Sequence, residues 1–259
     1  MNDSVKWRDV WAERAAASVS DYELDRGTSP REQEIEDLSK RELLAFIDPQ
    51  PADVILDVGC GTGINVFRLH STVKRVIGMD CASGALDRCR RRIETDRIEN
   101  VELIHGDATH LPSPESTVDK VICLSVFQYL DDAEVRTALK EFARVLRSGG
   151  RLILHVKNKS SLYLSTLCAA KKLKQLLGRQ TKSEYFRSYR WYITELRDAG
   201  FEVVAYNSFN LFMIESMPKK CLLFFQKLEL KRHNQFPFRI GFLRRRGAEL
   251  KIKARLAAG

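Results

Sequence analysis

The chain has 259 residues, 44% hydrophobic and 30% charged, which is ordinary for a globular protein able to bury a sizeable core. No run approaches the ~18–20 apolar residues of a spanning helix, and the first residues lack the apolar core of a signal peptide, so we expect a cytoplasmic protein. The six cysteines are scattered without a C-x-x-C pair, which disfavours a disulfide framework or a zinc site.

The net charge of +9 is unevenly distributed along the chain. Residues 151–259 hold 23 Lys/Arg against 7 Asp/Glu, whereas residues 1–150 hold 20 against 27. A basic half of this kind suits nucleic acid, an anionic membrane surface or an acidic substrate, and a solvated surface without a partner is the plain alternative.

The chain begins with two predicted helices, at residues 4–17 and about 31–47. Ser29 is a suitable N-cap for the second helix, and Pro30 stands just inside its start.

A strand and a glycine-rich turn follow at residues 54–63, Val-Ile-Leu-Asp-Val-Gly-Cys-Gly-Thr-Gly. The apolar start predicts a buried parallel strand. Gly59, Gly61 and Gly63 predict a sharp turn against which a ligand can lie, before a short helix at 64–70. Such a strand-to-helix loop is where doubly wound sheets bind nucleotides.

This stretch, Asp57-x-Gly59-x-Gly61-x-Gly63, resembles motif I of the class I S-adenosylmethionine (SAM)-dependent methyltransferases. An NAD-type loop reads G-x-G-x-x-G and differs in spacing by one residue. A glycine-rich turn without a ligand is the alternative on this stretch alone.

Two more acids follow the next predicted strands. Asp80 ends the strand at 75–80, where a carboxylate can accept both ribose hydroxyls. It could also be the N-cap of the helix at 82–94, and both roles could hold. Asp107 follows the strand at 101–105, and the resemblance implies that it binds the adenine amine. Three acids at successive strand ends suit the hydrogen-bond donors of SAM and would repel a pyrophosphate.

A fourth strand is predicted at 118–125, then a helix to Leu146, a turn at Gly149–Gly150 and a fifth strand at 151–156. In the family the end of the fourth strand passes beneath the methionine part of SAM. The resemblance therefore implies a set of cofactor-binding residues that follow these strands: Asp57, Gly59, Cys60, Gly61, Gly63, Asp80, Cys81, Asp107, Ala108, Leu124, Ser125 and Gln128.

The predicted fold class is α/β: a Rossmann-like, doubly wound, mostly parallel seven-stranded sheet with an antiparallel last strand and helical insertions. The sixth strand is expected at 201–206 and the last at 247–255, where apolar and polar residues alternate. The expected parts are a helical cap (1–48), a SAM-binding core (49–158), a helical insertion (159–188), and the rest of the core (189–259) with a second insertion at about 208–246.

The methyl of SAM is already activated, so the protein mainly has to position the acceptor and exclude water. His155 is the candidate general base, with His110 second, although a lone histidine is more often structural. Tyr129, Tyr185 and Tyr189 either line the acceptor pocket or pack. In the family, N-terminal helices often fold over the cofactor and line the acceptor pocket, so the resemblance implies that Arg26 and Arg31 are candidates for contacting a carboxylate.

The absence of several motifs disfavours some classes of methyl acceptor. There is no Asn/Asp-Pro-Pro-Tyr after the fourth strand, no Pro-Cys nucleophile, no glutamate pair of the arginine-methylating type and no acid cluster for Mg²⁺. A small-molecule, lipid-linked or glycan acceptor remains, with O- or C-methylation favoured over N-methylation and an anionic membrane as a possible contact. The competing interpretations are an RNA methyltransferase using the basic half, a non-catalytic SAM-binding protein and an NAD-dependent dehydrogenase.

Overall fold

The computed structural model describes residues 7, 10, 11, 41–161, 164, 184–209 and 248–257. Most of the predicted cap (1–48) and of the two predicted insertions (159–188 and 208–246) lies outside these residues, as do Arg26 and Arg31.

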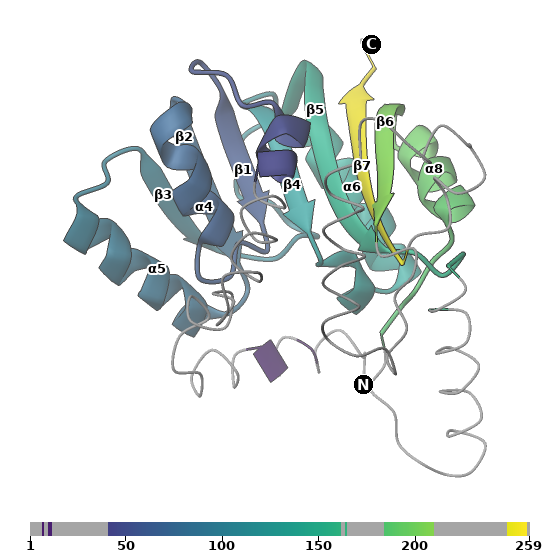
Figure 1. Ribbon diagram of the computed structural model, residues 1–259, viewed down its shortest axis with the longest axis horizontal. Helices are drawn as coiled ribbons and strands as arrows, with labels where there is room; N and C mark the ends of the chain where they lie inside the picture. The colour runs from purple at the N-terminus through teal and green to yellow at the C-terminus, as the bar shows by residue number, and fades with distance from the viewer. Residues whose placement is uncertain are drawn as a thin grey trace.

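Within the described residues the chain forms a seven-stranded sheet flanked by helices (Figure 1). The strands are β1 (Val54–Val58), β2 (Arg75–Asp80), β3 (Val101–His105), β4 (Val118–Leu124), β5 (Leu146–Lys157), β6 (Phe201–Phe209) and β7 (Glu249–Leu256). The helices are a segment at 41–47, α4 (Ile64–Leu69), η1 (His70–Thr72), α5 (Ser83–Asp96), η2 (Phe127–Tyr129), α6 (Asp132–Val145) and α8 (Tyr189–Asp198).

The strand order is β3-β2-β1-β4-β5-β7-β6. Neighbouring strands from β3 to β5 are parallel, and β7 lies antiparallel between β5 and β6. The predicted fold class, including the antiparallel last strand, is therefore confirmed. The chain moves outward from β1 to β3 and then crosses back to β4, so the carboxyl ends of β1 and β4 mark the switch point at which such sheets bind ligands.

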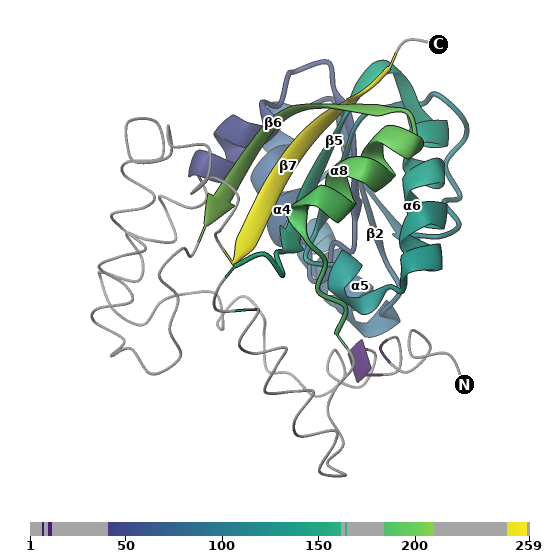
Figure 2. The ribbon, with the colours of Figure 1, turned by 90° about the vertical axis from the view of Figure 1, so that its right-hand side faces the viewer.

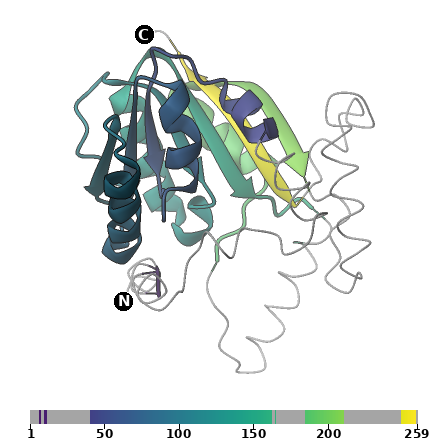
Figure 3. The same cartoon turned by 60° about the vertical axis from the view of Figure 1, so that its left-hand side comes forward.

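Helices lie against both faces of the sheet (Figures 2 and 3), and each face has its own hydrophobic core. One face packs against α6 and α8, through buried side chains such as Phe142 and Leu196. The other packs against α4 and the 41–47 helix, where Ile47 and Val66 are fully buried. Because the central strands are covered on both sides, β1 consists almost entirely of buried residues, as its apolar run predicts.

Helix α6 begins with a capping box between Asp131 and Glu134. The Asp131 side chain accepts from the Glu134 amide, and the Glu134 side chain accepts from the Asp131 amide. This cap fixes where the loop after β4 ends and the helix begins. It therefore sets the length of the loop that carries Ser125 and Gln128.

Candidate functional site

The loop between β1 and α4 is held tightly to β2. The amides of Gly59 and Cys60 both donate to the Met79 carbonyl, at 2.8 and 3.0 Å, and the Gly63 amide donates to the Cys60 carbonyl. All three glycines have positive φ, at 76°, 55° and 89° for Gly59, Gly61 and Gly63. Side chains rarely adopt this conformation, so the glycines are a backbone requirement.

The three glycines differ in their surroundings. A Cβ added at Gly59 would lie 2.3 Å from Val126 Cγ2, and one added at Gly63 would lie 2.5 Å from Cys89 Sγ. A Cβ at Gly61 would meet nothing within 4 Å. Packing therefore explains Gly59 and Gly63, whereas Gly61 presents bare backbone to open space, as a ligand-binding turn requires.

Asp80 links two of the loops at this edge of the sheet. Its Oδ2 accepts from the Gly61 amide and its Oδ1 from the Ala82 amide, both at 2.8 Å. The N-cap of α5 is Ala82, without a side-chain cap, so the interpretation of Asp80 as the N-cap is wrong. The carboxylate instead fixes the glycine loop beside the end of β2.

Asp57 is a buried carboxyl with an incomplete set of partners. It is 1% exposed, and its Oδ2 has no hydrogen-bond partner among the described residues. Burial, and secondarily the negative charge of Asp80, raises the pKa of Asp57 to about 7. A ligand with an N–H or ammonium donor would satisfy this oxygen, and the amino group of SAM is such a donor.

Asp107 shapes the turn after β3. Its Oδ1 accepts from the amide and the hydroxyl of Thr109, at 2.7 and 2.6 Å. The adjacent Ala108 is buried, whereas His110 is exposed. The strands β2, β1 and β4 separate β3 from β5, so the structure does not bring His110 to His155.

The remaining predicted cofactor residues also lie at the carboxyl edge of the parallel strands. Cys60 is buried two residues after the end of β1, and Cys81 is half-buried directly after β2. At the end of β4 lie the half-buried Leu124 and Ser125 and then the buried Gln128, whose Oε1 has no hydrogen-bond partner among the described residues. Four adjacent strands thus contribute to one edge, at which the residues present fit the donor groups of SAM.

The loop after β4 is anchored by Arg187, which sequence reasoning missed. Arg187 donates to Asp132 Oδ1 at 2.7 Å and to the carbonyls of Phe127 and Leu130 at 2.8 and 2.6 Å. The side chain is only 5% exposed, and its guanidinium lies 4.6 Å from the ring centroid of Trp191. Nothing local in the sequence signals this role, because the partners lie 55–60 residues away.

Aromatic rings from the N-terminal region reach the same loop. The rings of Trp7 and Trp11 lie 4.6 and 5.6 Å from that of Tyr129, and the described N-terminal residues lie below the carboxyl ends of the parallel strands in Figure 1. Tyr185 packs by Arg187, and its amide donates to the Gln128 carbonyl at 2.8 Å. Of the predicted pocket tyrosines, Tyr129 thus belongs to the loop after β4, and Tyr185 contacts this loop.

His155 lies near the end of β5 with a partner on each ring nitrogen. Its Nδ1 is 3.1 Å from Ser125 Oγ, and its Nε2 is 3.2 Å from Glu249 Oε2. Sequence reasoning missed Glu249, because only the antiparallel pairing of β5 with β7 brings it there. Among the described residues no group of three or more His, Cys, Asp or Glu is arranged to hold a metal ion.

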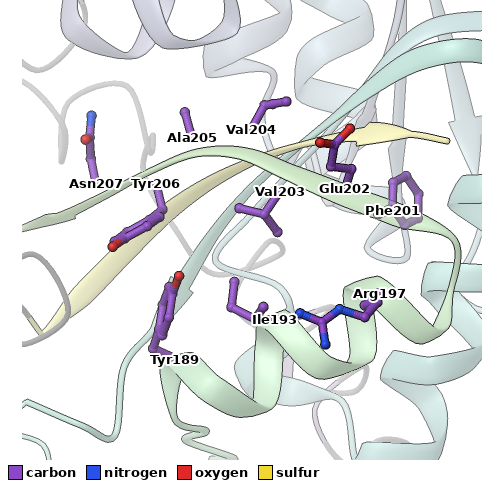
Figure 4. Close-up of a pocket in the computed structure, with 10 residues that line it drawn as sticks. All are labelled: Tyr189, Ile193, Arg197, Phe201, Glu202, Val203, Val204, Ala205, Tyr206 and Asn207. Atoms are coloured by element: carbon purple, nitrogen blue, oxygen red, sulfur yellow. The ribbon is translucent and has the colours of Figure 1, made fainter. Parts of the chain in front are cut away.

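A separate cavity of about 610 Å³ lies at the far edge of the sheet, between α8 and β6 (Figure 4). Tyr189 lines it and packs on Tyr206, with ring centroids 4.8 Å apart. The strands β4, β5 and β7 separate β6 from β1, so the structure does not bring Tyr189 to the glycine loop.

Comparison with known proteins agrees with this geometry. Residues 55–150 match the family described as methyltransferase domain. The chain is 32% identical over 117 residues to a demethylmenaquinone methyltransferase of Bacillus cereus, covering 44% of this chain and 48% of the relative. It is 37% identical over 109 residues to a malonyl-[acyl-carrier protein] O-methyltransferase of Yersinia pestis, covering 42% and 38%. The matches thus span less than half of these relatives.

A solved structure shares the fold at low identity. The Haemonchus contortus phosphoethanolamine N-methyltransferase 1, in complex with phosphoethanolamine and S-adenosylhomocysteine, superimposes with a TM-score of 0.67 at 18% identity. The similarity covers 99% of this chain and 49% of that one. Residues 55–150 are thus similar to a methyltransferase domain, and the described residues share the fold of this solved structure.

Proposed function

We propose that the protein is a SAM-dependent methyltransferase acting on a small-molecule, lipid-linked or glycan acceptor, by O- or C-methylation. One observation carries the proposal most strongly: Asp57, Asp80 and Asp107 come together at the carboxyl edge of three adjacent strands, beside the open backbone of Gly61. These groups accept hydrogen bonds, as a sulfonium cofactor with ammonium, ribose and adenine donors requires.

The strand ends suggest a role for each residue. Asp80 would accept the ribose hydroxyls, Asp107 the adenine amine and Asp57 the ammonium, while Gly59, Gly61 and Gly63 let the backbone approach. Cys60, Cys81, Ala108 and Leu124 would line the cofactor, with Ser125 and Gln128 beneath its methionine part. When bound, SAM supplies a methyl group on its sulfonium, and the electron pair of the broken C–S bond stays on sulfur.

The acceptor would lie over the ends of β4 and β5. Ser125, Gln128 and Tyr129 lie in the loop after β4, and the rings of Trp7 and Trp11 pack against Tyr129. An apolar, aromatic roof of this kind excludes water and suits a small organic acceptor. The names of the relatives, which include quinone and acyl-carrier-protein methyltransferases, also support a small or carrier-linked acceptor.

A transfer experiment tests the acceptor class. The protein is incubated with SAM carrying a labelled methyl group and a cell extract, which is then separated into RNA, protein, polar metabolites and lipids. We expect label in the metabolite or lipid fraction, and about 10- to 100-fold less with Asp80→Ala at a SAM concentration well below saturation. Label confined to RNA would contradict the proposed acceptor and favour the RNA methyltransferase.

Contact with an anionic membrane remains a sequence-based part of the proposal, because the basic insertions lie outside the described residues. No helix in the described parts is long and apolar enough to cross a membrane. Flotation with anionic liposomes at low salt tests the contact. Protein that stays at the bottom of the gradient would contradict it.

A further inference from the structure

Three side chains from distant parts of the sequence form a continuous chain of contacts near the proposed acceptor site. Ser125 follows β4, His155 lies on β5 and Glu249 begins β7. Ser125 Oγ lies 3.1 Å from His155 Nδ1, and His155 Nε2 lies 3.2 Å from Glu249 Oε2. The order is hydroxyl, imidazole, carboxylate, with the imidazole between the other two.

The carboxylate decides which imidazole nitrogen carries the proton. Burial alone would raise the pKa of Glu249, but the hydrogen bond from His155, the charge of His155 when it is protonated, and the ammonium of Lys157 hold this pKa well below its usual range. An ionised carboxylate can only accept, so Nε2 must donate to it. In a neutral imidazole this leaves the lone pair on Nδ1 to accept from the Ser125 hydroxyl.

The backbone holds Ser125 in place for this contact. The Ser125 amide donates to the His155 carbonyl at 2.8 Å, and Leu124 pairs with His155 across β4 and β5. Ser125 has a positive φ of 60°, which is uncommon for a residue other than glycine, asparagine or aspartate. Such a conformation persists only where the surroundings enforce it, and it turns the chain sharply just after the strand.

The carboxylate is anchored on its other oxygen. Lys157 donates to Glu249 Oε1, and Lys157 and Glu249 are directly paired across β5 and β7. Lys251, which is paired with His155 across the same two strands, forms an ion pair with Glu42. The side chains of His155 and Glu249 remain about one-fifth exposed, so protons can exchange with water.

We propose that Ser125, His155 and Glu249 form a proton relay that accepts the proton of a hydroxyl acceptor during methyl transfer. The inference rests on the proposed methyltransferase function and deepens it, because it assigns an acceptor that must lose a proton. As the acceptor oxygen bonds to the methyl carbon, its proton passes to Ser125 Oγ, and the Ser125 proton passes to His155 Nδ1. The imidazolium, stabilised by the Glu249 carboxylate, then releases a proton to water.

Ser125 and His155 would thus be catalytic residues, and Glu249 a positioning residue that orients the imidazole. The alternative is a purely structural link that joins the ends of β4 and β5 to the start of β7. Only the relay withdraws the Ser125 proton, and it therefore makes Ser125 Oγ unusually nucleophilic. Nucleophilicity can be measured without knowing the acceptor.

The test is covalent labelling of the full-length protein with a fluorophosphonate, followed by peptide mapping. The Ser125 oxygen forms a bond to phosphorus, fluoride leaves and the proton goes to His155. We expect labelling at Ser125, at least tenfold slower with His155→Gln and several-fold slower with Glu249→Gln, and restored in part by Glu249→Asp. The control Glu202→Gln removes an exposed carboxylate on β6 and should label as the wild type does.

Wild-type protein that leaves Ser125 unlabelled, or labels it equally with His155→Gln, overturns the relay. S-adenosylhomocysteine should slow the labelling of the wild type, because the relay opens toward the cofactor. If it binds but does not slow labelling, the relay has no part in methyl transfer. SAM that fails to bind in a parallel titration overturns the proposed function and, with it, the role of the relay in methyl transfer, even where labelling of Ser125 depends on His155.

Discussion

The amide of Gly61 donates a 2.8 Å hydrogen bond to Asp80 Oδ2, which ties the glycine loop to the end of β2. The other carboxylate oxygen accepts from the Ala82 amide. The acid is therefore held in a fixed orientation at the centre of the proposed cofactor site. Preorganisation of this kind lowers the entropy lost on binding.

Asp80→Ala should weaken SAM binding about 10- to 100-fold, because a hydrogen bond to a charged group contributes about 1.5–3 kcal/mol. The loss combines the ribose contact with the link to Gly61. Calorimetric titration measures it. The matched control is Asp87→Ala, which removes an exposed carboxylate paired with Arg90 on α5 and should bind as the wild type does. Equal affinities for both variants would contradict the role of Asp80.

Alanine at Gly61 and at Gly63 should have different effects. Gly63→Ala places a Cβ 2.5 Å from Cys89 Sγ and 2.8 Å from Phe67, at a φ of 89°, so it should destabilise the fold strongly. Gly61→Ala meets no neighbouring atom and should cost only about 1–2 kcal/mol of backbone strain, while it obstructs SAM. Thermal unfolding and titration separate the two effects. A Gly61→Ala protein that binds SAM normally would contradict close approach of the cofactor.

Asp57 should make the stability of the ligand-free protein depend on pH. The pKa of its carboxyl is 3.8 when unperturbed and about 7 in the fold, so the folded state favours the protonated form. The free energy of unfolding therefore falls as pH rises between these two values, and it stays at its lower value above about pH 7. Asp57→Asn removes this dependence. The free energy of unfolding of the variant minus that of the wild type should therefore be about 3 kcal/mol larger at about pH 8 than at about pH 5. Denaturant unfolding at the two pH values tests this, and a difference independent of pH would contradict it.

Arg187→Met should loosen the loop after β4. It leaves two carbonyls and Asp132 without their buried donor, so we expect a stability loss of about 3 kcal/mol. Hydrogen exchange at residues 125–131 should become faster. Arg190→Met, at an exposed position in the first turn of α8, is the control and should change neither quantity. Unchanged exchange with Arg187→Met would show that the loop is held by other contacts.

Local sequence signals predicted much of this architecture. The apolar run before Asp57 identified a strand covered on both faces, and the glycines after it identified a turn. Acids after successive strands could be placed together because parallel strands end at one edge of a sheet. These inferences need only local composition and the right-handed connectivity of such folds.

The parts that were missed depend on contacts between distant residues. Arg187 reaches back 55–60 residues to its partners, and Glu249 meets His155 across 94 residues only in one register of β7. Register is set by packing of the whole sheet, so neither contact has a local signature. Asp80 was open to two interpretations because its local sequence suits both, since an acid shortly before a helix resembles an N-cap.

Calorimetric titration of the wild-type protein with SAM and, separately, with NAD tests the central claim most directly. The acids after β1, β2 and β3 favour hydrogen-bond donors and repel a pyrophosphate, so we expect SAM to bind in the micromolar range and NAD not to bind. Binding of NAD without binding of SAM would contradict the assignment of this edge of the sheet to a methyl donor.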